Sequence, residues 1–388
     1  MRAALVLITG PGFGGAERRF FRLFNKISET RDDLYLITNK GAFLTAKQRG
    51  FVDDRKNICY IADNKPAKGF LQLRPIAKII SVARTFYQIF QIRQVVKKKK
   101  IAHMHFLVNP GYISYAFSSF ALIFGVTTGV TVVESTKTDK KSFTEREWKH
   151  WSKTLKTVKA IEVLSPGIYR DLLAVFGEEV AEKVKIAPCS FTDYTRAKPG
   201  GERAIDICFA SRLVAHKGLD LLFDSLELIE DRLEKDYGNK LRVDICGSGP
   251  LKKNAEVRAA RINNIDVNLY YEDDLFEVFS NTKIFLSLQK KENYPSQSLL
   301  EAMASEVAVV VTDVGDSKLM VPDGSGYLVP GNASDVANAV IELLNNPENR
   351  CRIAKNGRDF VLNEHNIERY TDHFSRFIDR CLNQEKPC

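Results

Sequence analysis

The sequence predicts an α/β protein of two doubly wound domains in tandem, and three observations support this fold class. Short apolar runs alternate with amphipathic helical patterns, as in parallel sheets covered by helices on both faces. The alternation stops between residues 188 and 203, where proline, glycine and charged residues gather as in a linker, and then resumes. The length of 388 residues also suits two or three domains.

The first domain is expected over residues 1–190. Its strands are predicted at short apolar runs, 5–10, 34–38, 101–106, 129–136, 161–165 and 184–188. Apolar residues spaced by three and four predict helices over 16–27 and 75–96. The candidate core residues of the longer helix are Ile76, Ile79, Ile80, Ala83, Phe86, Phe90 and Val95. Phe86 and Phe90 are expected to belong to the core rather than to insert into a membrane.

The second domain is expected over residues 191–365, and a C-terminal helix, 366–388, is expected to cross back to the first domain. Its strands are predicted at 206–211, 241–247, 267–271, 283–288 and 307–313. Ligands of doubly wound sheets bind at the carboxyl ends of the strands. The two domains are therefore expected to face each other across a ligand-binding cleft.

A polar loop, residues 289–294, leaves the predicted strand at 283–288, and Pro295 is expected to open the helix that follows. Free backbone N–H groups and the positive end of the helix dipole would then point at the loop and form an anion site. Glu301 lies inside this helix, where a buried glutamate needs a partner. A nucleotide sugar offers one, because its diphosphate suits the helix N-terminus and its ribose hydroxyls suit the carboxylate.

Arg212 and Lys217 follow the first strand of the second domain and lie five residues apart. Two cations there can clamp a diphosphate and stabilise the charge that develops as it leaves. Alone they are more simply interpreted as surface cations, but the anion site predicted at Pro295 favours the binding role. Gly247 and Gly249 form a turn after the next strand, where a backbone can come close to a base or a phosphate.

The glycine-rich turn at residues 10–15 suggests a dinucleotide fingerprint, but Asn39 and Lys40 stand where that fingerprint needs an acid. A turn that faces a sugar or phosphate explains it better. His103 and His105 alternate along one predicted strand, and we expect them to point to opposite faces, so that at most one faces a cleft. The sequence has no Asp-x-Asp triplet and no G-x-S-x-G pattern, which leaves a metal-held diphosphate and a serine hydrolase without support.

The net charge of +9 is unevenly distributed. Residues 64–133 contain ten lysines and arginines and no acid, and the basic residues end in the run 97–100. Such a stretch attracts the phosphates of anionic lipids, lipid diphosphates or nucleic acid, although a solvated basic face is the simpler alternative. No nucleic-acid-binding module accompanies it, so nucleic acid is not an expected partner. Seven cysteines without a C-x-x-C pair predict a reducing compartment, with neither disulfides nor zinc.

Several segments together resemble the landmarks of the retaining glycosyltransferases of family four, in that family's order. They read GGAER, ASRLVAHKGLDLL, ICGSGP, NYPSQSLLEAMAS, and PDGSGYLVP followed by NASDVANAVIELL. The resemblance spans nearly the whole chain and is weakest between residues 53 and 160. It implies the GT-B fold, in which two Rossmann-like domains face each other across a cleft.

The same resemblance implies roles for individual residues. Gly14 and Gly15 would line the cleft beside the donor diphosphate, and Arg212 and Lys217 would bind that diphosphate during catalysis. Glu301 would bind the ribose hydroxyls. The backbone of Ser296, Gln297 and Ser298 would meet the sugar and the phosphates. Gly247 and Gly249 complete the expected donor-binding set.

Two positions depart from the family's pattern. The family has two glutamates eight positions apart, but the eighth position before Glu301 is Asn293, and Glu292 lies one residue further. Either Glu292 or Asn293 fills the first acidic position. The family also commonly ends a first-domain strand with a histidine near the reacting sugar. This chain has Glu134 there, and His105 is the substitute considered.

These features predict a retaining glycosyltransferase of the hexosyltransferase type that uses a nucleotide-sugar donor, with UDP as the expected nucleotide, and needs neither metal nor cofactor. The expected acceptor is a lipid-linked or polysaccharide-precursor glycan, and the expected location is the cytoplasm or the inner face of the cytoplasmic membrane. Two alternatives remain open. One is a non-hydrolysing UDP-sugar 2-epimerase, and the other is a catalytically inactive sugar- or lipid-binding protein on the same scaffold.

An anionic membrane surface is a further candidate partner. Each lysine or arginine near an anionic bilayer contributes roughly 1 kcal/mol, so the four lysines at 97–100 could hold the protein there reversibly. The attachment is expected to be electrostatic and sensitive to salt, without a membrane span.

Overall fold

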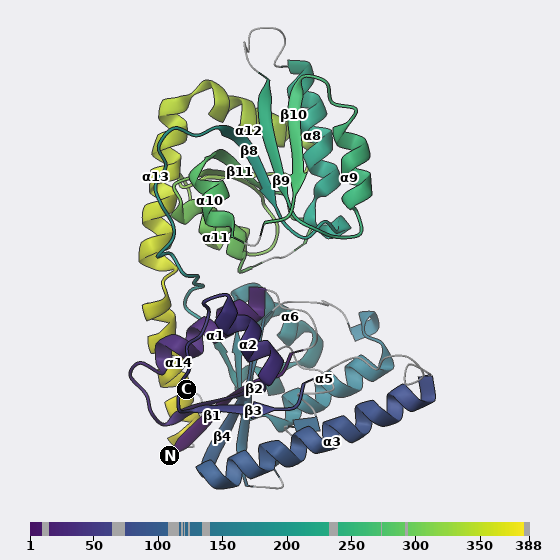
Figure 1. Ribbon diagram of the computed structural model, residues 1–388, viewed down its shortest axis with the longest axis vertical. Helices are drawn as coiled ribbons and strands as arrows, with labels where there is room; N and C mark the ends of the chain where they lie inside the picture. The colour runs from purple at the N-terminus through teal and green to yellow at the C-terminus, as the bar shows by residue number, and fades with distance from the viewer. Residues whose placement is uncertain are drawn as a thin grey trace. The chain divides into compact units, whose positions relative to one another are not determined.

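The computed structural model describes residues 1–9, 15–63, 74–107, 116–117, 119, 121–122, 125–133, 140–232, 240–272, 274–291 and 294–383. It divides into two compact units (Figure 1). Unit 1 is Met1–Cys189 together with the chain from Ile367 onward, and unit 2 is Ser190–Asn366. The α/β class predicted from the alternation of apolar runs and helical patterns is confirmed.

The described part of unit 1 is a seven-stranded parallel sheet in the order β3-β2-β1-β4-β5-β6-β7, with helices packed on it. Its strands are β1 (Arg2–Leu7), β2 (Leu34–Asn39), β3 (Ile58–Ile61), β4 (Ile101–Phe106), β5 (Thr127–Val132), β6 (Ala160–Val163) and β7 (Val184–Ile186). Its helices are α1 (Gly15–Ile27), α2 (Lys40–Gln48), α3 (Arg74–Lys99), the short η2 (Lys140–Ser142), α5 (Glu145–Thr157), α6 (Pro166–Phe176), α7 (Glu178–Ala181) and α14 (Ile367–Asn383).

The described part of unit 2 is a six-stranded parallel sheet in the order β10-β9-β8-β11-β12-β13. Its strands are β8 (Ile205–Ala210), β9 (Leu241–Cys246), β10 (Ile265–Tyr270), β11 (Thr282–Ser287), β12 (Ala308–Thr312) and β13 (Tyr327–Val329). Its helices are η3 (Ala215–Lys217), α8 (Leu219–Arg232), α9 (Lys252–Ala259), α10 (Leu275–Ser280), α11 (Gln297–Ala304), η4 (Ser317–Leu319), α12 (Ala333–Asn345), α13 (Pro347–Glu364).

Each sheet reverses its winding direction at one place. In unit 1 this switch point lies between β1 and β4, and in unit 2 it lies between β8 and β11. In sheets of this kind, ligands bind at the carboxyl ends of the strands beside such a switch point, where the loops leave neighbouring strands in opposite directions. The topology therefore directs attention to the loops after β8 and β11.

The last helix of the chain, α14, packs in unit 1. It contacts α1, β1 and β4, and Figure 1 shows it in yellow beside the purple α1. Its apolar face buries Tyr370, Phe374 and Phe377. Arg31 pairs with Asp379 of the helix at 2.8 Å.

Helix α3 contradicts the predicted core. Ile79, Ala83, Phe86 and Phe90 are exposed, Ile80 and Val95 are half-buried, and the side chain of Ile76 lies outside the described residues. The residues that α3 buries are instead Gln88, Ile89, Ile92 and Val96. The prediction was wrong because α3 has two apolar faces, and only the one near its C-terminal end lies on the sheet. Figure 1 shows its other half running past the sheet edge.

Helix length and hydropathy bear on the expectation that the chain has no membrane span. Among the helices that the structure describes, none is both long enough and apolar enough to cross a bilayer.

Candidate functional site

The candidate site of unit 2 is built at its switch point, from the loops that follow β8 and β11. Arg212 and Lys217 lie on the first loop, with Arg212 exposed and Lys217 half-buried at the end of η3. The second loop runs from Leu288 to α11. Because β8 and β11 pair in parallel, with Phe209 opposite Leu286, both loops leave the same edge of the sheet.

Close backbone contacts join these two loops. The amide of Lys290 donates a hydrogen bond to the carbonyl of His216 at 3.0 Å. Gly218 has φ of +81°, and a Cβ placed on it would lie 1.7 Å from the carbonyl oxygen of Leu288. Only glycine therefore allows the loop of Lys217 to lie so close to the loop that leads into α11.

The glycine turn after β9 supports the same loop from the other side. Leu213 donates its amide to the carbonyl of Ser248 at 2.9 Å, and Leu251 donates to the carbonyl of Leu213 at 3.1 Å. A Cβ on Gly247 would lie 2.0 Å from the Ser211 carbonyl oxygen, and one on Gly249 would lie 2.5 Å from that of Leu213. The backbone that these glycines admit is thus the chain's own loop, and direct contact with a donor stays a prediction.

Helix α11 begins two residues later than predicted. Ser296 is extended, with φ −84° and ψ 111°, and takes the N-cap position, so that Gln297 rather than Pro295 is the first helical residue. The first helical hydrogen bond runs from the Leu300 amide to the Ser296 carbonyl at 3.2 Å. No side chain among the described residues caps this end, which leaves first-turn N–H groups and the positive helix dipole for an anion.

Glu301 and Gln297 connect α11 to the segment that enters unit 2. The hydroxyl of Thr192 donates to Oε1 of the buried Glu301 at 3.3 Å. The Gln297 amide donates to the carbonyl of Phe191 at 3.1 Å. Ser298 is half-buried in the first turn. A carboxylate thus lies on the helix whose N-terminus suits an anion, as the predicted ribose role of Glu301 requires.

Gln289 is a candidate that the sequence motifs did not identify. It lies two residues after β11, its carbonyl accepts from the Thr312 hydroxyl at 2.6 Å, and its side chain is buried. Its Oε1 has no hydrogen-bond partner among the described residues. A buried oxygen without a donor costs about 1–3 kcal/mol, so a bound hydroxyl or N–H group would stabilise it. A polar residue two positions after a buried switch-point strand was the available signal.

The electrostatics of the loop are positive, with one ion pair at its edge. Lys290 forms an ion pair with Asp220 at the start of α8. Burial raises the pKa of the Asp220 carboxyl, but hydrogen bonds from Lys290 and backbone N–H groups outweigh this and lower that pKa below its usual value. Asp220 therefore stays ionised and neutralises Lys290, while Arg212 is exposed beside the loop.

His105 of unit 1 lies in a buried polar network. Its Nε2 lies 2.8 Å from the Thr131 hydroxyl, which in turn donates to Oε2 of the buried Glu162 at 2.8 Å. The hydroxyl of Tyr370 donates to the same oxygen at 2.9 Å. Because Thr131 gives its one proton to Glu162, Nε2 of His105 must carry the proton that Thr131 accepts. Burial holds the pKa of His105 well below 6.5, so the ring is neutral.

Two expectations about the histidines change as a result. His103 and His105 share one face of β4, with ring centroids 6.0 Å apart, so the prediction that they point to opposite faces was wrong. Residues two apart on a strand point the same way. His105 is also completely buried against Phe374 and Phe377 of α14. No exposed surface of the ring is left for a sugar, and we assign His105 no catalytic step.

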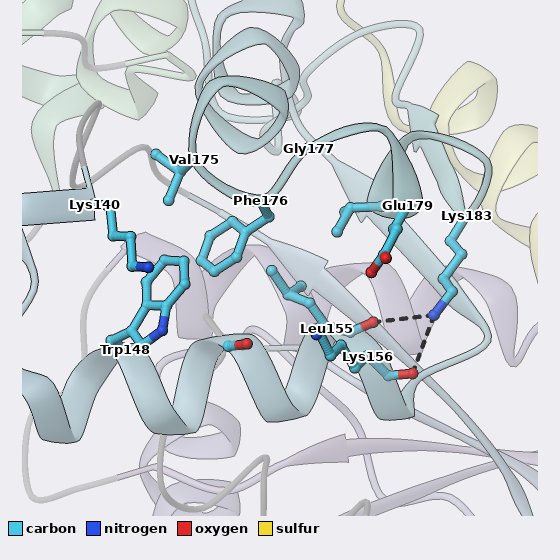
Figure 2. A pocket seen from close by; sticks show the side chains of 11 residues that line it. Lys140, Trp148, Leu155, Lys156, Val175, Phe176, Gly177, Glu179 and Lys183 are labelled. Atoms are coloured by element: carbon cyan, nitrogen blue, oxygen red, sulfur yellow. Dashed lines mark hydrogen bonds between the residues drawn. The ribbon is translucent and has the colours of Figure 1, made fainter.

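A pocket of about 630 Å³ lies elsewhere in unit 1, among α5, α6 and α7 (Figure 2). Trp148 and Phe176 stack at 5.0 Å on one side of it, and Lys183 donates to the last carbonyls of α5, Leu155 at 3.3 Å and Lys156 at 3.1 Å. These residues directly precede β6 and β7 in the chain, so the pocket lies at the amino ends of the strands. It is at the edge of the unit 1 sheet opposite to the carboxyl ends of the strands, so it does not lie at the switch point of that sheet.

The structure therefore brings together most of the predicted donor residues of unit 2. Gly15 is the first residue of α1 and belongs to unit 1. Gly14, Glu292 and Asn293 lie outside the described residues, as does Glu134. The choice between Glu292 and Asn293 thus stays as the sequence leaves it.

Comparisons with known proteins agree with this geometry. Residues 192–360 match the family model described as Glycosyl transferases group 1. An uncharacterized glycosyltransferase of Methanocaldococcus jannaschii is 29% identical over 156 residues, 39% of this chain and 42% of that protein. The chain thus matches less than half the length of this curated relative.

Two solved structures show the fold. Sucrose-phosphate synthase of Thermosynechococcus elongatus has a TM-score of 0.74 at 16% identity, covering 99% of this chain and 100% of that chain. HepE of Anabaena, in complex with UDP, has a TM-score of 0.70 at 15% identity, covering 98% of this chain and 100% of that chain. At such identities the likeness shows the fold alone, and it confirms the predicted GT-B architecture. Residues 192–360, which lie within unit 2, are thus similar to the glycosyl transferases group 1 family.

Proposed function

We propose that the protein transfers a sugar from a UDP-sugar to an acceptor hydroxyl with retention of the anomeric configuration. The observation that carries the proposal is the switch point of unit 2, where Arg212, Lys217, the N-terminus of α11 and the buried Glu301 follow β8 and β11 within a group 1 domain. UDP is supported as the nucleotide because structurally similar HepE was solved with UDP and with UDP-glucose.

Each group of the site then has its own role in the reaction. The first-turn N–H groups of α11 hold the diphosphate, and Arg212 and Lys217 stabilise the negative charge that grows on it as the bond to the sugar breaks. Glu301 accepts hydrogen bonds from the ribose hydroxyls. The absence of an Asp-x-Asp triplet from the sequence favours a reaction without a metal, and activity is expected to survive a chelator.

The acceptor we propose is a lipid-linked or polysaccharide-precursor glycan at the cytoplasmic face of a membrane. The support is the acid-free stretch 64–133, which belongs to unit 1 and carries ten basic residues. Phosphates of a lipid diphosphate and of a bilayer surface are attracted by the same charge.

A thermal-shift screen across nucleotide sugars tests the donor. A ligand present at 100 times its Kd stabilises the protein by about 2.7 kcal/mol, which such a screen detects. We expect a UDP-sugar to give the largest shift, and NMR of the product to show the anomeric configuration of the donor. Donor incubated without acceptor distinguishes the alternatives, because a 2-epimerase converts it to a new nucleotide sugar. No shift with any nucleotide sugar would refute the proposal.

A further inference from the structure

Helix α3 presents an apolar stripe to solvent. Ile79 is 68% exposed, Phe86 58% and Phe90 53%, and Val82 is exposed between them. Their spacing of three and four residues places them on one face of the helix. Tyr87, 54% exposed, extends the same face. The stripe is thus a continuous surface rather than a set of scattered side chains, and continuous exposed apolar surface marks an interaction site.

The rest of α3 explains why this face is available. Ile89, Ile92 and Val96 are buried on the opposite side, and Gln88 and Gln91 hydrogen-bond the backbone of Ala62. Unit 1 therefore fixes the helix by its C-terminal half. The half that contains Ile79 and Phe86 carries large apolar side chains that the unit does not need for its core.

The charge around the stripe identifies the kind of partner. α3 carries no aspartate or glutamate, and none occurs anywhere in residues 64–133. Arg93 and Lys97 continue the apolar face by one and two turns beyond Phe90. Lys97, Lys98 and Lys100 are exposed, whereas Lys99 lies over the Tyr35 ring at 5.3 Å. Aromatic and aliphatic side chains bordered by cations suit the boundary between anionic headgroups and acyl chains.

We propose that α3 lies in the surface of an anionic phospholipid bilayer, with Ile79, Val82, Phe86 and Phe90 inserted below the headgroups. Such helices lie in the plane of the interface at a depth of about 5–10 Å, with their basic side chains on the lipid phosphates. Insertion replaces the purely electrostatic attachment expected from the lysine run. Only the purpose of the insertion rests on the proposed function: it would bring unit 1 to a lipid-linked acceptor.

Vesicle flotation of the full chain tests the inference without any transfer reaction. We expect binding to vesicles of phosphatidylcholine with phosphatidylglycerol, and a residual bound fraction at about 1 M salt, where the Debye length is only about 3 Å. Phe86→Ser with Phe90→Ser should weaken partitioning at least tenfold at both salt concentrations, about 1.4 kcal/mol. Lys97→Gln, Lys98→Gln and Lys100→Gln together should weaken it at low salt only.

A matched control uses the exposed apolar residues Val257 and Tyr271 of unit 2, whose replacement by serine should leave binding unchanged. The thermal shift with UDP-sugar should be equal in wild type and in the phenylalanine variant, which separates failure of this inference from failure of the proposed activity. Wild-type binding by the phenylalanine variant overturns the inference, as does complete release of the wild type at high salt. Self-association without lipid that the same variant abolishes would assign the stripe to a second copy of the chain.

Discussion

The switch point of unit 2 and the region beneath α14 in unit 1 use polar and charged groups differently. The candidate site of unit 2 is shaped by backbone contacts, such as Lys290 to His216, and Arg212 is exposed there. Unit 1 buries Glu162 and His105 in a network beneath α14, while it exposes the apolar stripe of α3. A site shaped by main-chain hydrogen bonds can keep its charges for a ligand. Unit 1 hydrogen-bonds Glu162 internally, so a partner of this unit would contact exposed features such as the α3 stripe instead.

The largest expected effect tests whether the cations of the unit 2 site contribute to catalysis. Removing one preorganised group that stabilises a leaving charge typically costs about 2.7–4 kcal/mol, so Arg212→Ala or Lys217→Ala should reduce kcat on the order of a hundredfold or more. The melting temperature should stay unchanged. Steady-state kinetics measures the first and thermal unfolding the second, with Lys355→Ala on α13 as an exposed cation control. Wild-type turnover in both variants would remove this site from the mechanism.

Gly218 sharpens the claim that backbone packing shapes the site. An alanine there meets the Leu288 carbonyl at 1.7 Å with φ at +81°, so Gly218→Ala should destabilise unit 2 by about 2–4 kcal/mol and weaken donor binding. Gly331→Ala is the control, because a Cβ at Gly331 meets no atom within 4 Å. Hydrogen exchange of α8 and α11 locates the effect. Equal exchange in the two variants would contradict the packing argument.

Low pH should distinguish the two units, because it should destabilise unit 1 through its buried histidines. Burial lowers the pKa of His103 to about 3 and that of His105 well below 6.5, so the unfolded chain binds protons that folded unit 1 does not. Stability is then lost as the pH falls from about 6.5 toward 3, by about 2 kcal/mol at about pH 5 for His103 alone. Fluorescence of Trp148 and Trp151, both on α5, reports unfolding of unit 1.

A variant of each kind tests the origin of that slope. His103→Gln should flatten the dependence of the unit 1 unfolding free energy on pH, whereas His216→Gln, an exposed histidine of unit 2, should leave it intact. Parallel slopes in wild type and His103→Gln would show that other groups are responsible.

The smallest effect concerns two threonines that hydrogen-bond buried glutamates. Thr192→Val removes the donor to Glu301 and should weaken UDP-sugar binding about two- to tenfold, in line with a net hydrogen bond of about 0.5–1.5 kcal/mol. Thr131→Val removes one of the two hydroxyl donors to Glu162 and should destabilise unit 1 while leaving the affinity for UDP-sugar unchanged. Calorimetric titration with the donor distinguishes the two. Equal losses of UDP-sugar affinity in the two variants would contradict the assignment of donor binding to unit 2.

The sequence predicts unit 2 better than unit 1, for a physical reason. Strand, turn and helix succeed one another at the switch point, so Arg212, Lys217 and Glu301 can be placed from local patterns. Periodicity on α3 shows which faces are apolar but not which of two apolar faces meets the sheet, and Phe86 was misplaced. Helix α11 begins at Gln297 and not at the predicted Pro295, because residue types alone do not show that the backbone of Ser296 is extended.

The return of α14 to unit 1 also orders events during synthesis. Domains tend to fold as they emerge, N-terminal first. Unit 1, however, cannot place Arg19 of α1 over the Tyr370 ring until residues beyond Ile367 have left the ribosome. Unit 2, whose residues end at Asn366, can close earlier. Unit 1 thus stays incomplete, with apolar surface exposed, until a segment translated after unit 2 has joined it.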